Sequence, residues 1–186
     1  MEHYFTADLH IGHARIREFH PDRPGPSVEE MNEAIVDNWN ATVGRKDTIH
    51  VLGDFAMGKL DDSLKYFYRL NGTKHLVAGN HDGNRTKKLP WVTVTDLKVF
   101  KQKPYASAVL CHYPLLTWEG AHHGRIMLHG HSHGLLHPSL NATTTRMDVG
   151  IDTHPEFRPY HIDEVAEYMD GREYQVIDGH GLTPDR

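Results

Sequence analysis

Seven side chains that can bind metal ions come directly after short apolar runs. These side chains are Asp8 and His10 after the run 4–7, Asp54 after 48–52, Asn80 after 75–78, His112 after 106–111, and His131 and His133 after 125–128. In an open α/β sheet, the residues that leave the carboxyl ends of neighbouring strands meet at one edge. The sequence therefore predicts that these seven donors form one cluster.

The spacing of the donors supports this convergence. Asp8 with His10, and His131 with His133, are pairs two residues apart, and such pairs project to the same side of an extended segment. A glycine stands before three of the donor segments, at positions 53, 79 and 130, where it permits a tight turn and a close approach of backbone to a bound ion. Strand alternation directs Cys111 away from His112, which predicts a packed core thiol.

The donor set indicates which metals the cluster binds. It offers two carboxylates, one amide oxygen and four imidazoles but no sulfur, in a chain with 17 histidines. Such a set suits Mn²⁺, Fe, Zn²⁺ or Ni²⁺ better than Cu(I), and it is too rich in nitrogen for a calcium site. Seven ligands exceed what one such ion takes, so two ions that share a carboxylate are expected.

Composition excludes several other classes of protein. The chain has 186 residues, of which 38% are hydrophobic and 24% charged, and this favours one globular domain over residues 1–186. A single cysteine excludes a disulfide framework, and a net charge of −5 argues against an extended nucleic-acid surface. No segment approaches the ~20 apolar residues of a membrane span. The chain starts with a strand pattern in place of a signal peptide, so we expect a cytoplasmic protein, in the host cytoplasm if a phage encodes it.

The elements that must position the donors alternate between strands and helices, as in an α/β domain. Ser27 to Glu30 is a capping box, and it predicts a helix that ends at Gly44. Further helices are expected from Asp61 to Asn71 and over 163–169. Alternating residues over 91–101 predict one half-exposed antiparallel strand, and the polar tail after about residue 178 is expected to be loose.

The complete motif series resembles that of the calcineurin-like metallophosphoesterases. The matching elements are Asp8-x-His10, Gly53-Asp54, Gly79-Asn80-His81-Asp82, His112 and Gly130-His131-x-His133. The segment from Asp148 to Pro159 resembles small phage and bacterial members of that family. The resemblance implies an α/β fold, in which two mixed β-sheets pack as a sandwich flanked by helices. It also implies a binuclear centre, with manganese favoured, that hydrolyses phosphoester bonds.

The resemblance also assigns individual roles. Asp8, His10 and His133 hold one ion, Asn80, His112 and His131 hold the other, and Asp54 bridges the two. A hydroxide shared by the ions attacks phosphorus. His81 is the catalytic histidine that stabilises the phosphate or protonates the leaving group, and Asp82 orients its imidazole.

Departures from the family pattern bear on the substrate. The protein-phosphatase branch carries arginines after its Gly-Asp motif and before its Gly-Asn-His motif, where this chain has Phe55 to Gly58 and Ala78. Without that clamp, a singly charged diester is expected to be favoured over a doubly charged monoester. Expected substrates are small phosphodiesters, such as 2′,3′- or 3′,5′-cyclic nucleotides, or nucleic-acid ends. Two alternatives remain open: a phosphomonoesterase or nucleotide pyrophosphohydrolase on the same site, and a non-catalytic metal-binding interaction scaffold.

Five further residues are weaker candidates for contact with substrate. His13 follows the first motif, Arg85 follows the His81 motif, and Trp118, His122 and His123 lie between the two ligand strands that end at His112 and His129. The Trp118 ring could stack on a base if that segment borders the site. Each of the five could equally be an ordinary surface or core residue.

Overall fold

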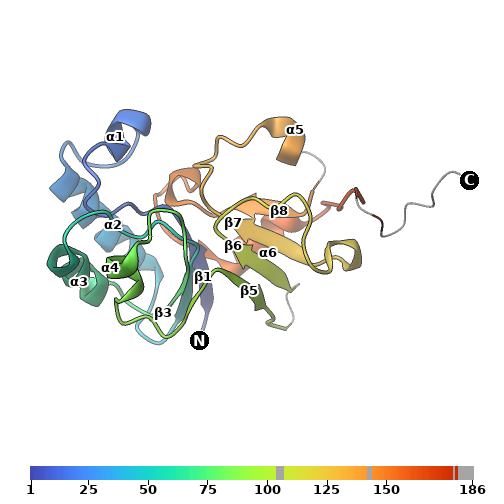
Figure 1. Cartoon of the computed structure of the whole chain (residues 1–186), viewed down its shortest axis with the longest axis horizontal. Helices are drawn as coiled ribbons and strands as arrows, with labels where there is room; N and C mark the ends of the chain where they lie inside the picture. The colour runs from blue at the N-terminus through green and yellow to red at the C-terminus, as the bar shows by residue number, and fades with distance from the viewer. Residues whose placement is uncertain (104–106, 142–143, 178, 180–186) are drawn as a thin grey trace, which may run out of the picture.

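The computed structural model describes residues 1–103, 107–141, 144–177 and 179, and its architecture consists of two β-sheets with flanking helices (Figure 1). The first sheet has the strand order β4-β3-β2-β1-β9. Its strands are β1 (His3–Thr6), β2 (Thr48–Val51), β3 (Thr73–Val77), β4 (Val94–Thr95) and β9 (Tyr160–His161). The first four run parallel to one another, and β9 pairs antiparallel with β1.

The second sheet has the order β5-β6-β7-β8. Its strands are β5 (Leu97–Phe100), β6 (Ala108–Cys111), β7 (Ile126–His129) and β8 (Arg146–Asp148). Strands β6, β7 and β8 are parallel, and β5 is antiparallel to β6. Both sheets are therefore mixed. The expected architecture of two mixed sheets with flanking helices is confirmed.

Buried side chains form three layers around these sheets. Phe5 and Val77 from the first sheet, with Leu52 just after β2, pack with Leu110 and Leu128 from the second sheet, and these residues belong to the core between the sheets. A second core lies between the outer face of the first sheet and helices α2 (Val28–Thr42) and α3 (Leu60–Arg69), which Figure 1 shows on the side away from the second sheet. A third, smaller core covers the outer face of the second sheet and includes the buried Cys111, as expected.

The longer helices begin and end close to where the sequence predicts. Ser27 caps α2 by accepting a hydrogen bond from the Glu30 amide at 3.2 Å. Helix α6 (Ile162–Met169) begins with a capping box in which the side chain of Glu164 accepts from the His161 amide at 2.7 Å. Short helical turns complete the described part: α1 (Ile16–Phe19), α4 (Asn84–Lys87), η1 (Ala121–His123), α5 (Pro138–Asn141) and η2 (Ile151–Thr153). Among the described residues, every helix is too short or too polar to cross a bilayer.

The predicted single strand over 91–101 is wrong. That segment divides into β4, which joins the first sheet parallel to β3, and β5, which joins the second sheet antiparallel to β6. Asp96 lies between the two strands, so the chain crosses here from one sheet to the other. Continuous alternation cannot reveal this change of partner, because both halves remain extended. The start of the predicted strand at Ala106 and the tail residues 178 and 180–186 lie outside the described residues.

Candidate metal centre

The carboxyl ends of the parallel strands meet where the two sheets join. The amide of His131, after β7, donates to Asp8 Oδ2 after β1 at 2.9 Å. The amide of His81, after β3, donates to Asp54 Oδ1 after β2 at 2.8 Å. These bonds tie the segments that leave both sheets into one site, as the strand-end pattern predicts.

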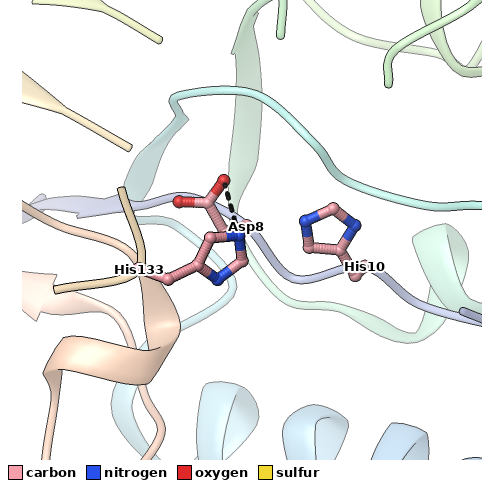
Figure 2. Close-up of side chains that lie close together, drawn as sticks. All are labelled: Asp8, His10 and His133. Carbon is pink, nitrogen blue, oxygen red and sulfur yellow. Dashed lines mark ion pairs between the residues drawn. The ribbon is translucent and has the colours of Figure 1, made fainter. Parts of the chain in front are cut away.

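The first group of donors comprises Asp8, His10 and His133, whose ligand atoms lie within 4.8 Å of one another. Figure 2 shows Asp8 and His10 on the segment after β1 and His133 approaching from the segment after β7. His133 Nε2 lies 3.9 Å from Asp8 Oδ1. Within the described residues, Asp8 Oδ1 and both ring nitrogens of His10 are buried without a hydrogen-bond partner. Such unpaired buried polar atoms are costly unless a cation or a proton lies among them.

The second group comprises Asn80, His112 and His131. His112 Nδ1 lies 2.8 Å from the Leu52 carbonyl, so this nitrogen carries the proton and His112 Nε2 presents a lone pair. Asn80 Oδ1 lies 2.9 Å from that Nε2 and 3.2 Å from His131 Nδ1. An amide oxygen this close to an imidazole lone pair is the arrangement that a shared cation stabilises.

Asp54 lies between the two groups. Its Oδ2 is 3.7 Å from His10 Nε2, which belongs to the first group, and 3.6 Å from His112 Nε2, which belongs to the second. Asp54, Asp8 and His112 also form a set whose ligand atoms lie within 4.8 Å of one another. The carboxylate of Asp54 is only 2% exposed, so it needs a positive partner in place of water.

Backbone strain concentrates at these residues. Asp8, His10, Asp54, His131 and His133 have φ angles between 48° and 69°, and among the described non-glycine residues only Phe157 shares this left-handed conformation. Left-handed φ is unfavourable for residues with a Cβ, and it persists where the surrounding structure imposes it. Five of the seven predicted ligands thus adopt a strained conformation of the kind that clusters at functional sites.

Two glycines permit the close approach of these segments. Gly53 has a φ of 89°, and a Cβ there would collide with the His112 ring and the Gly79 backbone. A Cβ on Gly130 would collide with the side chain of Ala7 and with Asp8 Oδ2. Glycine before the donors thus permits close approach of the chain segments at these two positions, and the approach of backbone to a bound ion stays a prediction.

The electrostatics of the site fit a cation. Burial, with contributions from the Asp148 and Asp54 carboxylates, raises the pKa of Asp8 well above its usual range. Burial also lowers the pKa of His10 to about 2, so its imidazole is neutral and its lone pair is available. A bound cation favours both the ionised carboxylate and the neutral imidazole. The donors present therefore fit divalent metal ions.

His81 lies at the rim of this cluster. Its side chain is 43% exposed, its Nε2 is 4.0 Å from Asp54 Oδ2, and its ring contacts that of His10 edge-on at 5.4 Å. Asp82 does not have the expected place beside the His81 imidazole. Its carboxylate accepts hydrogen bonds from the amides of Gly79, Asp54 and Phe55 at 2.8–3.0 Å. Asp82 therefore holds together the two backbone turns that carry Asp54 and Asn80.

Of the weaker candidates, His13 and Arg85 lie on segments that belong to the site. The His13 ring is 5.3 Å from that of His10, and its buried Nδ1 has no hydrogen-bond partner in the described part of the chain. Arg85 is exposed on α4, which follows the His81 segment.

The expectation that Trp118, His122 and His123 border the site is wrong. Parallel strands β6 and β7 require a connection that returns to their amino ends, and these three residues lie on the returning part. Trp118 Nε1 donates to the Arg125 carbonyl at 2.7 Å, just before β7 begins. The Trp118 side chain is only 7% exposed and packs in the third core with Cys111.

Sequence reasoning missed three residues that the structure places beside the centre. Tyr113 is 44% exposed, and its ring lies 4.8 Å from that of His131. Asp152 accepts from His133 Nδ1 at 2.7 Å, and Arg23 pairs with Asp152. Asp152 lies in the segment from Asp148 that resembles small phosphoesterases, which was a usable signal. Nothing in the local sequence marks Arg23 or Tyr113.

Comparison with known structures shows a shared fold but no activity. A protein of unknown function from Aquifex aeolicus matches 90% of this chain and 98% of its own length, with 22% identity and a TM-score of 0.73. An archaeal phosphodiesterase is a weaker neighbour, with 17% identity, coverage of 81% and 84%, and a TM-score of 0.45. At that level, the similarity establishes neither a shared fold nor a shared activity.

Comparison with known sequences identifies relatives in phages. No family model matches the chain. The Gene 66 protein of Mycobacterium phage D29 is 29% identical over an alignment 194 residues long, and the alignment covers 89% of this chain and 94% of the phage protein. The Gene 66 protein of Mycobacterium phage L5 is 30% identical over 179 residues, which cover 80% of this chain and 86% of the phage protein. The chain therefore belongs to the family of the mycobacteriophage Gene 66 proteins.

Proposed function

We propose that the chain is a metal-dependent phosphodiesterase of the calcineurin-like type, which acts on small diesters such as cyclic nucleotides or nucleic-acid ends. The observation that carries this proposal is the position of Asp54, whose Oδ2 lies within 4.0 Å of ring nitrogens of His10, His112 and His81. A carboxylate placed between two sets of metal-binding side chains fits a bridging ligand, and an exposed imidazole beside it fits a general acid.

The two groups of donors give the ligand assignment. Asp8, His10 and His133 would hold one ion, Asn80, His112 and His131 the other, and Asp54 both. Two divalent ions in such a centre supply Lewis-acid activation of water and neutralise phosphate charge, and manganese suits this nitrogen and oxygen set. The number and identity of the ions form part of the proposal.

The chain's own residues then position and protonate the substrate. His81 is exposed at the rim, so its Nε2–H can reach the ester oxygen that leaves and donate a proton to it. Asp82 keeps the Asp54 and Asn80 turns together through three backbone amides, and so it preserves the distance between the bridging carboxylate and His81.

The preference for diesters rests on what occupies the positions of the arginine clamp. Phe55, Ala56 and Ala78 are buried apolar residues, with exposed fractions of 0%, 4% and 9%, and they offer no charge to a phosphate. A diester has one negative charge and needs no such clamp, whereas a monoester dianion binds best with a bidentate cation. Tyr113 takes over the role expected of Trp118, because its exposed ring beside His131 offers a surface on which a base can stack.

The closest alternative is a phosphomonoesterase or nucleotide pyrophosphohydrolase on the same centre, for which the exposed Arg85 is the available cation. A scaffold that merely binds metal is disfavoured, since it has no need of an imidazole at the position of His81. The relation to phage proteins favours action in the cytoplasm of an infected cell.

Paired substrates test the proposal. In one Mn²⁺ buffer, we expect bis(p-nitrophenyl) phosphate to be cleaved with a higher kcat/KM than p-nitrophenyl phosphate. Cyclic nucleotides should also be turned over, and the 2′,3′ isomers should be slightly favoured because ring strain lowers their barrier. A tenfold preference for the monoester would contradict the diester assignment, and Arg85→Ala would then show whether Arg85 is the clamp. Absence of hydrolysis of every phosphoester by the Mn²⁺-loaded protein would favour the scaffold.

A further inference from the structure

A buried ion pair lies directly behind the candidate metal centre. Arg23 Nε and Nη2 donate to Asp152 Oδ1 and Oδ2 at 2.7 and 2.6 Å, and the two side chains are 0% and 5% exposed. Removing both charges from water costs several kcal/mol, so such a pair contributes little net stability by itself. The other contacts of Arg23 and Asp152 therefore indicate a role beyond stability.

On one side, the guanidinium of Arg23 holds the turn that carries Asp8. Nη2 donates to the Asp8 carbonyl at 2.6 Å, and Nη1 donates to the Leu9 carbonyl at 2.8 Å. Asp8 is one of the residues with left-handed φ, at 57°. Arg23 thus stabilises a backbone conformation that the chain would otherwise disfavour.

On the other side, the carboxylate of Asp152 holds His133. Its Oδ2 lies 2.7 Å from His133 Nδ1, so Nδ1 carries a proton and Nε2 presents its lone pair toward Asp8 Oδ1. The rings of His10 and His20 stack on that of His133 at 5.3 and 4.4 Å, within 19° of parallel. The His133 ring is therefore restrained in tautomer, in direction and in tilt.

His20, His133 and Asp152 have ligand atoms within 4.8 Å of one another, so these three residues are an alternative candidate for a metal site. The Arg23 guanidinium argues against it. Both oxygens of Asp152 already accept from Arg23, and a fixed positive charge at 2.6 Å repels a further cation. The cluster is better suited to orient His133 than to bind an ion.

We propose that Arg23 and Asp152 form one positioning unit, which presets Asp8 and His133 to bind the first ion of the proposed centre. This inference rests on the proposed metal centre, and it is independent of the substrate. Carboxylate partners of ligating histidines typically contribute 10–100-fold to metal affinity. None of the hydrogen bonds described for Arg23 and Asp152 reaches Asn80, His112 or His131. Loss of the unit should therefore weaken the binding of the first ion only.

The chain contains a matched control for this unit. Arg158 donates to both oxygens of Glu164 at 2.7 and 2.9 Å, and His154 Nε2 lies 3.4 Å from Glu164 Oε1. This is also an arginine–carboxylate–histidine arrangement, but His154 is not a predicted ligand, and its Nδ1 accepts from the Glu156 amide. Loss of either carboxylate should destabilise the chain, whereas only the loss of Asp152 should alter metal binding.

Titration of the metal-free protein with Mn²⁺, followed by calorimetry and by the Mn²⁺ electron paramagnetic resonance signal, tests the inference. We expect two binding events in the wild type. Asp152→Asn should weaken one of them about 10–100-fold and leave the other unchanged. Glu164→Gln should leave both unchanged. If Asp152→Asn binds both ions as the wild type does, the inference is wrong while the proposed function stands. If the wild type binds no Mn²⁺, both fail.

A second measurement avoids the risk that the variant does not fold. Nitrogen-15 spectra of the imidazoles in metal-free wild-type protein, with His133→Asn for assignment, report which ring nitrogen carries the proton. We expect His133 to be protonated at Nδ1, with a slowly exchanging proton bonded to Asp152. A proton on Nε2, or rapid averaging of both tautomers, would overturn the inference.

Discussion

Two groups of histidines in this chain occupy opposite environments, one beyond the ends of strands and the other within strands. His10, His112, His131 and His133 follow the carboxyl ends of strands, and His10 and His112 lie within 3.7 Å of the Asp54 carboxylate. The other group, His3, His50 and His75, forms a row across β1, β2 and β3, with ring centroids 6.2 and 5.1 Å apart. The row packs against Phe100 of the second sheet, and the charged groups that act on His50 are Lys98 and the other two imidazoles.

The difference teaches that position on the strand decides what a histidine can do. His50 lies within β2, where the backbone is extended and the ring is buried between the sheets. Asp54 follows four residues later, where a left-handed turn directs side chains to the edge of the sheet. Abundance of histidine is thus no evidence of chemistry by itself. Carboxylate partners and, for His10, His131 and His133, strained turns distinguish the predicted ligands from the packing residues.

The largest expected effect is the loss of the Asp54 carboxylate, the proposed bridge between the two ions. Asp54→Asn should abolish Mn²⁺-dependent hydrolysis, because the amide cannot neutralise two ions, and chelation of the wild type should do the same. Elemental analysis of the loaded wild type should find two ions per chain. His75→Gln, from the row, is the matched control and should retain activity. Full activity with one ion at saturation would contradict a binuclear centre.

His81→Ala should lower kcat by about 10²–10⁴-fold, the range for a positioned acid or base, with metal content near that of the wild type. If His81 protonates the leaving oxygen, alkyl esters should lose more activity than nitrophenyl esters. Equal losses would assign His81 to electrostatic stabilisation of the phosphate. Loss of an ion from the variant would move His81 from the catalytic residues to the ligands.

Tyr113→Ala should raise KM for nucleotide diesters about 5–150-fold, which corresponds to the ~1–3 kcal/mol of one stacked base. Tyr113→Phe keeps the ring and should behave as the wild type. The comparison is made by steady-state kinetics with cyclic nucleotides. If neither variant changes KM, no base stacks on this ring.

The buried His50 in the middle of this row should make the fold sensitive to acid. Burial lowers the pKa of His50 to about 2 from its ordinary 6.5, so the unfolded chain takes up a proton that the folded chain refuses. The contribution of His50 to stability is complete above about pH 6.5 and is lost as the pH falls toward 2, by up to about 1.4 kcal/mol per pH unit. Urea unfolding in chelator between pH 7 and pH 5 measures this slope.

His50→Leu should make that slope shallower, because the buried titratable group is gone. His137→Leu, at an exposed position, is the control and should leave the slope as in the wild type. If the two variants have the same dependence of unfolding free energy on pH, then His50 in the folded chain is either protonated or exposed to water.

The smallest effect is expected at η1. His122→Ala and His123→Ala should change kcat/KM by less than about twofold, because both residues lie on the returning part of the β6–β7 connection, away from the carboxyl ends. A larger loss would show that this connection reaches the substrate, as the sequence analysis expects of His122 and His123.

Much of the site could be predicted from local sequence. A parallel strand must end with its next residues at the edge of the sheet, so apolar runs followed by Asp, His or Asn identify the seven donors before any packing is known. The cap at Ser27 and the bounds of α2 are likewise properties of neighbouring residues. The division of 91–101 between two sheets could not be predicted, because alternation is the same whichever sheet accepts the strand.

The sequence by itself determined which donors leave the strands and in what order, because strand ends and turns depend on residues close together in the chain. Only the tertiary structure decided what supports those donors. Arg23 precedes α2, and Asp152 lies in η2, 129 residues away, so their pairing depends on how distant parts of the chain pack together. Trp118 is a core residue for the same reason. Burial depends on the surfaces that meet in the folded chain, and no local pattern specifies them.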